Sequence, residues 1–226
     1  FTGSVFFDGT GDNLTIPAST DFAWGTGDFT WEAWVYSTAS DHTTGNHYMF
    51  DLGGGNLGAM SYYENKFNYY NTTVGGTRQI GGFAAFEWHH VAVARQSGTT
   101  YMFLDGVMES SFADTHNYGT SALAVEIAGY AGGSTLNWQG YISNLRVCKG
   151  HAVYTGNFTV PTRELEVHTK PPKGVVFPAA DNVTVLLACQ SSTDATADSS
   201  GRHTITAGGN ATAADANPGL LSNTNI

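Results

Sequence analysis

Charged side chains are scarce in this sequence. Only 12% of its 226 residues are Asp, Glu, Lys or Arg, which is about half the usual share. The nine Lys and Arg residues are scattered and the formal net charge is −10, whereas a phosphate-binding surface needs clustered basic side chains. The composition therefore argues against a nucleic-acid partner, and the negative charge opposes docking on anionic membranes.

Long hydrophobic runs are also missing. No apolar stretch approaches the roughly 20 residues of a membrane-spanning helix, so we expect no membrane insertion. No signal peptide is recognisable, but the chain begins at Phe1 rather than Met, so this absence says little about export.

Cysteine is limited to Cys148 and Cys189. Two residues are too few for a disulfide framework, and a zinc site would need four clustered ligands. Two interpretations stay open, because the pair could form one disulfide or each thiol could be a small buried hydrophobe.

The residues that are plentiful favour strands. Hydrophobic residues make up 41% of the chain and aromatic residues 13%, with 28 glycines, which excludes disorder and is enough to fill a two-layer core. Short apolar segments alternate with turns such as Asp105-Gly106, a strong hairpin signal. In Phe29–Tyr36 the alternation places Trp31 toward the core and Trp34 on the outer face. The sequence predicts an all-β, two-sheet antiparallel jelly-roll β-sandwich.

Composition also suggests four parts of the chain. We expect residues 1–168 to form the jelly roll and residues 169–182, which contain Lys170-Pro171-Pro172-Lys173, to be an extended spacer. Residues 183–207 are predicted to be terminal strands that complete the sandwich. Residues 208–226 lack periodicity, so we expect an extended tail.

Four segments carry a family resemblance: Ser4–Pro17, Phe29–Tyr36, Trp88–Met108 and Gly140–Lys149. Together they resemble the laminin-G-like branch of the concanavalin A-like lectin/glucanase superfamily. The continuation GHAVYTGNFTVPTREL is similar to the repeat modules of marine phage structural proteins. The resemblance implies a glycan-facing jelly-roll β-sandwich, extracellular or on a virion surface.

The order of one segment departs from that resemblance. In laminin-G-like jelly rolls a segment like VTVLLACQSSTDATADSSGRHTITAGG precedes the SVFFDG segment, and here it follows. Either the module is cyclically shifted, or the chain holds one module and the opening strands of the next. We favour the shift, because an apolar strand should not be left unpaired. The late strand would then pair near Tyr141–Cys148, with Cys148 and Cys189 on neighbouring strands.

Catalytic residues of the family are not evident. Its glucanases carry an E-x-D-x-x-E strand, and retaining hydrolysis needs two carboxyl groups roughly 5 Å apart. Glu32 is the only acid within Phe29–Tyr36, so we predict that the chain is not an enzyme. Glu32 is either an anchored carboxylate or a groove residue that accepts hydrogen bonds from sugar hydroxyls.

Aromatic residues are the stronger ligand signal. The C–H faces of sugars stack on Trp and Tyr rings, while carboxylates and amides bind the hydroxyls. Ordinary strand packing is the competing interpretation for each ring. The glycan-binding candidates are Tyr62, Tyr63, Tyr69, Tyr70, Trp138, Trp24 and Glu32.

Calcium is the cofactor that the sequence allows. It takes six to eight oxygen ligands, often from Asp side chains on turns, and the resemblance implies calcium at the rim of the sandwich. The candidate ligands are Asp8 and Asp12 in one turn, and Asp194 and Asp198 in another. These aspartates could instead shape their turns through bonds to the backbone.

These observations favour a non-catalytic, lectin-like module. We expect it on a virion, as a fibre, tail or capsid decoration, or on a cell exterior, where it binds surface polysaccharide or mediates adhesion. The alternative is a structural decoration or filament subunit, a homo-oligomer that assembles by strand or tail exchange. A glucanase-like hydrolase is the third possibility.

Overall fold

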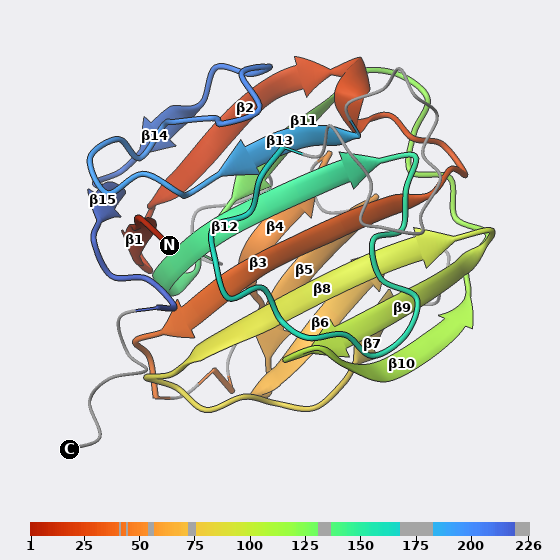
Figure 1. The fold of residues 1–226 in the computed structure, drawn as a ribbon, viewed down its shortest axis with the longest axis horizontal. Coiled ribbons are helices and arrows are strands. Elements are labelled where there is room, and N and C mark those ends of the chain that lie inside the picture. The colour runs from red at the N-terminus through yellow and green to blue at the C-terminus, as the bar shows by residue number, and fades with distance from the viewer. Residues whose placement is uncertain are drawn as a thin grey trace.

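The protein is a sandwich of two antiparallel β-sheets in a computed structural model (Figure 1). Among the described residues the only helix is the short 3-10 helix η1 (Thr20–Phe22), and no helix there is long and apolar enough to cross a bilayer. The predicted spacer and residues 220–226 of the predicted tail lie outside the described residues. The structure describes residues 1–40, 42–43, 45–53, 57–71, 76–130, 137–167 and 183–219.

The first sheet, sheet A, is centred on the long strand β12. Its strand order is β10-β9-β8-β3-β12-β1-β15, and β13 also pairs with β12. One edge of β12 pairs with β3, while the other pairs first with β1 and then with β13. The strands are β1 (Ser4–Asp8), β3 (Phe29–Ser37), β8 (Trp88–Gln96), β9 (Thr99–Leu104), β10 (Val107–Ala113), β12 (Gln139–Lys149), β13 (Thr184–Ala188) and β15 (Thr212–Ala214).

The second sheet, sheet B, lies behind sheet A in Figure 1 and has the order β14-β2-β11-β4-β5-β6-β7. With the long connections between sheets, this arrangement is the jelly roll that the sequence predicts. The strands are β2 (Asn13–Ser19), β4 (His47–Leu52), β5 (Gly58–Tyr63), β6 (Lys66–Asn71), β7 (Gly76–Gln79), β11 (Leu123–Ile127) and β14 (Thr206–Gly208).

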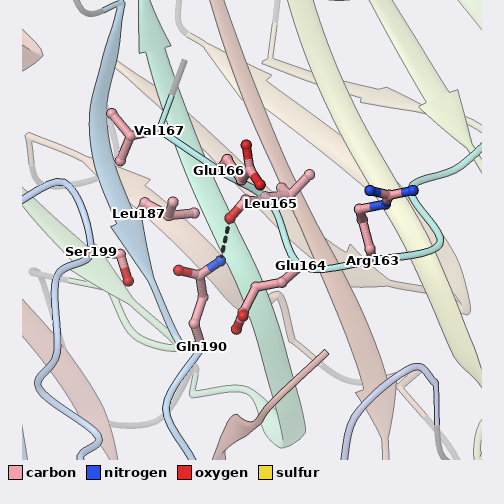
Figure 2. A pocket seen from close by; sticks show the side chains of 8 residues that line it. All are labelled: Arg163, Glu164, Leu165, Glu166, Val167, Leu187, Gln190 and Ser199. Atoms are coloured by element: carbon pink, nitrogen blue, oxygen red, sulfur yellow. Dashed lines mark hydrogen bonds between the residues drawn. The ribbon is translucent and has the colours of Figure 1, made fainter. Parts of the chain in front are cut away.

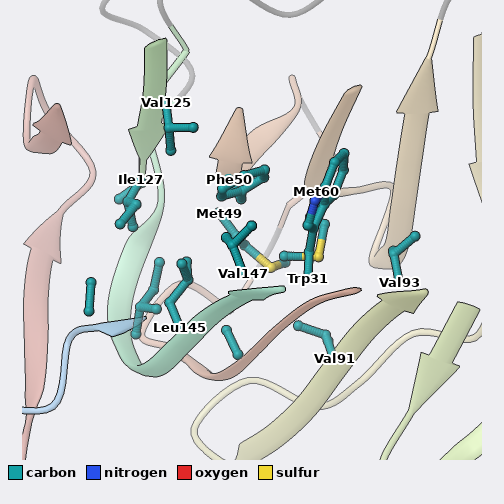
Figure 3. Packing of buried hydrophobic residues seen from close by; sticks show 14 of the residues in the cluster. Trp31, Met49, Phe50, Met60, Val91, Val93, Val125, Ile127, Leu145 and Val147 are labelled. Atoms are coloured by element: carbon teal, nitrogen blue, oxygen red, sulfur yellow. The ribbon is translucent and has the colours of Figure 1, made fainter. Parts of the chain in front are cut away.

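The core between the sheets is built around Trp31. Its fully buried ring stacks on Phe29 with centroids 4.6 Å apart, and Figure 3 shows it facing Met60 of sheet B. Glycine is required at position 58, because a Cβ there would lie 2.6 Å from the Trp31 ring. Trp34 lies outside this core cluster, so the predicted facing of β3 is confirmed.

The outer face of sheet A carries a smaller core of its own. The segment 150–167 runs from the end of β12 across the front of this sheet (Figure 1). Its rings at Tyr154 and Phe158 stack 3.6 Å apart and pack against Phe103. Ala92 and Ala94 on β8 belong to the same cluster. Because their side chains are small, the segment can approach the sheet closely.

The late strand pairs where the cyclic shift predicts. In the register of β12 and β13, Leu145 lies opposite Ala188 and Cys148 opposite Thr184. Some residues of the expected tail belong to sheet A, because β15 pairs with β1. The expected extended tail is therefore partly a sheet strand.

A disulfide between the cysteines is contradicted. Both thiols are free and buried, and Cys189 follows β13 at its far end, where its carbonyl accepts a bond from the Asn144 amide. Cys148 and Asn144 are four residues apart on β12, about 13 Å along a strand, whereas a disulfide needs Cα atoms within about 7 Å. The cysteines are thus the small buried hydrophobes of the second interpretation.

Candidate functional site

Glu32 is an anchored carboxylate. It accepts hydrogen bonds from Arg146 Nε (2.8 Å) and His90 Nε2 (3.2 Å) of sheet A and from the Tyr154 hydroxyl (2.8 Å) of the segment 150–167. Burial alone would raise the pKa of Glu32, but the Arg146 charge and the His90 hydrogen bond outweigh it and lower this pKa to about 2. The carboxylate is fully buried, so the prediction that Glu32 contacts a sugar is wrong.

Four of the aromatic candidates belong to the core. Tyr62, Tyr69, Trp24 and Trp138 are at most 6% exposed, and the Tyr62 hydroxyl donates to the Phe83 carbonyl at 2.7 Å. Their ring faces are covered by neighbouring side chains, so a sugar cannot stack on them. Ordinary strand packing is the correct interpretation for these four.

The other two tyrosines lie on the outer face of sheet B. Strand residues alternate between faces, and Tyr63 and Tyr70 follow the inward-pointing Tyr62 and Tyr69. Both are partly exposed. Of the aromatic candidates, only these two have a ring open to a ligand.

The register of sheet B brings Tyr70 into a row with two carboxylates. Glu126 of β11 pairs with Asp51 of β4, Asp51 with Ala59 of β5, and Ala59 with Tyr70 of β6. Asp51 points outward because Phe50 and Leu52 beside it lie in the core. Cross-strand partners have Cβ atoms about 5 Å apart, so the row is continuous across four strands.

A second row lies beside the first. Tyr48 of β4 pairs with Ser61 of β5, and Ser61 with Asn68 of β6. Tyr48 also stacks on Tyr130, with ring centroids 5.0 Å apart. We call the two rows and Tyr130 the polar face; its residues are Tyr48, Asp51, Ser61, Asn68, Tyr70, Glu126 and Tyr130.

The residues of the polar face differ in their exposure to solvent. Asp51, Ser61 and Asn68 are at most 1% exposed, whereas Tyr70 and Tyr130 are partly exposed. Asn68 donates from Nδ2 to the Lys66 carbonyl (3.2 Å), and in the described part of the chain its Oδ1 accepts no hydrogen bond. A buried acceptor without a partner is costly, but Asn68 is closed to solvent, so a ligand meets the partly exposed residues of the face instead.

The electrostatics of the polar face are acidic. Burial and the nearby charge of Asp51 raise the pKa of Tyr48 to about 12. Burial also raises the pKa of Glu126, although the Asn13 amide, which donates to it at 2.6 Å, acts in the opposite direction. These groups accept hydrogen bonds from hydroxyl or amine donors, and the partly exposed tyrosines beside them offer ring faces to C–H groups.

The four aspartates expected to bind calcium are occupied by turn donors. Asp12 accepts from the Asp8 amide (2.9 Å) and the Asn210 amide (2.7 Å). Asp194 accepts from the Thr196 amide and hydroxyl. The described residues hold no group of three or more His, Cys, Asp or Glu side chains placed for a metal. Calcium stays a prediction, and these turns are explained without it.

Asp198 gives the sharpest test of the turn interpretation. Its carboxylate accepts from the amides of Leu187, Ser200, Arg202 and His203 at 2.9–3.1 Å. Asp198→Ala is therefore expected to lower the free energy of unfolding by about 2 kcal/mol, equally in calcium and in excess chelator. Thermal unfolding of both proteins measures this; a chelator effect on the wild type that the variant lacks would identify Asp198 as a calcium ligand.

Comparison with known proteins agrees with this architecture. The family model described as the concanavalin A-like lectin/glucanases superfamily matches residues 8–152. No curated protein matches the chain.

Solved structures resemble the fold at low identity. A carbohydrate-binding protein from Bacteroides ovatus is 15% identical with a TM-score of 0.61, over 93% of this chain and 61% of that one. The heptameric pentraxin of Limulus polyphemus is 12% identical with a TM-score of 0.54, over 92% and 94% of the two chains. Domain 4 of an extracellular arabinanase from Geobacillus stearothermophilus, in complex with arabinotriose, is 14% identical with a TM-score of 0.51, over 66% and 71%. Because the family match covers well over half of the sequence, the chain belongs to the laminin-G-like branch of the concanavalin A-like lectin/glucanase superfamily.

Proposed function

We propose that this protein is a non-catalytic glycan-binding module whose polar face on sheet B holds a saccharide. The observation that carries the proposal is the row in which Asp51 and Tyr70 flank the small residue Ala59. An exposed ring beside buried acceptors matches the two surfaces of a sugar, its C–H face and its hydroxyl edge.

The structural neighbours support this class of ligand. One is named as a carbohydrate-binding protein and another was solved with arabinotriose. We infer a location outside the cell or on a virion surface, as a fibre, tail or capsid decoration that meets surface polysaccharide. Calcium at the rim of the sandwich remains part of the proposal, as a cofactor.

Truncation of Tyr70 tests the proposal. Tyr70→Ala is expected to weaken binding to a recognised polysaccharide about 3- to 10-fold, since one ring contact contributes about 0.5–1.5 kcal/mol. Tyr36→Ala is the matched control, because Tyr36 is a partly exposed tyrosine of sheet A. The measurement is a glycan-array screen followed by calorimetry. Equal losses for the two variants, or no glycan bound, would refute the polar face as the site.

Hydrolysis is the alternative for the same residues. Asp51 and Glu126 are cross-strand partners, so their Cβ atoms lie about 5 Å apart and their carboxyl groups can approach the roughly 5 Å separation that retaining glycosidases use. Release of reducing ends from the bound polysaccharide, lost in Glu126→Gln, would establish an enzyme. A non-catalytic module binds without such release.

A structural subunit is the second candidate function, and edge strand β10 favours it. Val107 and Met108 on this strand are 48% and 38% exposed, and an exposed apolar edge can pair with a strand of another copy. Assembly of the purified chain in the absence of glycan, measured by light scattering, would support this reading. The two functions are compatible in a receptor-binding fibre.

A further inference from the structure

A polar pocket lies on the opposite side of the molecule from the polar face. It forms where the segment 163–167 meets the residues that follow β13, and it has a volume of about 320 Å³ (Figure 2). A second hollow of about 340 Å³ adjoins it and extends to Thr2. The two share Glu164, Gln190 and Ser199 as lining residues, so together they form one continuous groove.

Gln190 fixes an acceptor at the junction of the two hollows. This side chain is only 7% exposed, and its Nε2 donates to Asn144 Oδ1 (2.8 Å) and to the Leu165 carbonyl (2.7 Å). Because both amide protons are used, the orientation of the amide is determined. Its Oε1 therefore faces the pocket, as Figure 2 shows, and no described residue donates a hydrogen bond to it.

The backbone beside Gln190 is held in an unusual conformation. Asn144 and Cys189 are non-glycine residues in the left-handed region, with φ of 53° and 60°, and the Asn144 amide donates to the Cys189 carbonyl at 3.0 Å. The same Asn144 side chain accepts from the Leu165 amide at 2.8 Å. This arrangement places Gln190 and Leu165 on the pocket wall. The positive φ angles of Asn144 and Cys189 cost conformational energy, and ordinary strand pairing does not require them.

The lining determines the chemistry of the ligand. Glu164 contributes a carboxylate, of which Oε1 accepts from the Thr2 hydroxyl at 2.6 Å, and Ser199 contributes an exposed hydroxyl. Leu165 and Leu187 supply an apolar wall. Arg163 lies beyond Glu164, away from Gln190 (Figure 2). Arg163 lines that far end of the pocket, whereas the part around Glu164, Gln190 and Ser199 presents acceptors and negative charge beside an apolar surface.

We propose that this groove binds a glycan segment that carries an unacetylated amino sugar. A protonated amine donates three hydrogen bonds, which matches the free Gln190 carbonyl oxygen, the Glu164 carboxylate and the Ser199 hydroxyl. The C–H face of the sugar ring packs on Leu165 and Leu187. A lysine side chain could place its ammonium in the first hollow, but it has no hydroxyls for the Ser and Thr residues of the second, so the two-hollow groove favours the glycan.

Calorimetry with a glucosamine disaccharide tests the proposal. The wild type is expected to bind it, and the N,N′-diacetyl disaccharide about tenfold more weakly or not at all, because acetylation removes the charge. Glu164→Gln should weaken amine binding about tenfold, whereas the matched control Glu109→Gln, an exposed carboxylate on β10 at the other edge of sheet A, should leave binding unchanged. Tyr70→Ala on the polar face should also leave it unchanged, so this result and the proposed function can fail independently.

Several outcomes would overturn the inference. These are equal affinity for the acetylated disaccharide, equal losses in Glu164→Gln and Glu109→Gln, and no binding of the glucosamine disaccharide at about 10 mM. Binding of N-α-acetyl-lysine methylamide without binding of the disaccharide would assign the pocket to a protein ligand instead. A ¹⁵N-labelled sample should show the shifts of the Gln190 side-chain amide only with the amine-bearing probe.

Discussion

Replacing Glu32 with alanine is expected to lower the free energy of unfolding by about 3–5 kcal/mol. The variant would leave the Arg146 guanidinium, only 3% exposed, without its counter-charge, and would remove the acceptor for Tyr154 and His90. An uncompensated buried charge costs more than the ion pair contributes. Urea unfolding at pH 7, followed by tryptophan fluorescence, gives the difference directly.

The double variant Glu32→Leu with Arg146→Met is the matched control. It removes both charges and keeps the volume of the site, so it should be clearly more stable than Glu32→Ala. A single variant no less stable than the wild type would show that the network under the segment 150–167 does not hold that segment to sheet A. Glycan binding at the polar face should be unaffected in either folded variant.

The same carboxylate predicts a dependence on pH. Because the pKa of Glu32 is about 2 in the folded protein and 4.5 is its ordinary value, the unfolded chain binds a proton at higher pH than the native state does. The stabilisation from Glu32 is therefore complete above pH 4.5 and is lost as the pH falls toward 2. Acid unfolding should be shallower in the Glu32→Leu, Arg146→Met protein over this range.

Most of the correct predictions came from the alternation of apolar and polar residues along single strands. In β3 the core position of Trp31 and the outer position of Trp34 follow from a period of two residues, which sequence shows directly. The pairing of β13 with β12 was predicted from the segment order of the laminin-G-like jelly rolls, and the need to pair an apolar strand favoured the cyclic shift. The first argument depends on a single strand, whereas the second depends on the family resemblance.

The candidate site could not be read in the same way. The segment SYYENKFNYYNTT has aromatic residues on both faces, so alternation alone does not say whether Tyr69 or Tyr70 is buried. The turn at Glu64 and Asn65, both with positive φ, sets the register that decides it. Asp51 and Glu126 meet only through the pairing of β4 with β11, strands that are far apart in sequence, so no local pattern indicates the row.

The C-terminal segment 183–219 is expected to be indispensable for folding. It supplies β13 to sheet A, β14 to sheet B and β15 to sheet A, and it buries Val185, Leu186, Leu187 and Ile205. At about 1.5–3 kcal/mol for each buried side chain, these four contribute about 6–12 kcal/mol, comparable with the whole stability of a domain. A chain that ends at residue 167 should therefore be unfolded or aggregated by circular dichroism and gel filtration.

Moving the segment 183–219 to the N-terminus, instead of deleting it, tests whether folding depends on where the segment lies in the chain or only on its presence. Gly219 lies against Phe1, since a Cβ at residue 219 would be 3.5 Å from the Phe1 ring, so residues 183–219 can be joined directly ahead of Phe1 in a chain that ends at residue 167. This permuted chain keeps every strand pair of both sheets and has the segment order seen in laminin-G-like jelly rolls. We expect it to fold and to unfold cooperatively within about 2 kcal/mol of the original chain, because loop closure changes stability only slowly with loop length. If the permuted chain fails to fold while a 1–167 chain folds alone, the segment does not complete this sandwich and serves a neighbouring module instead.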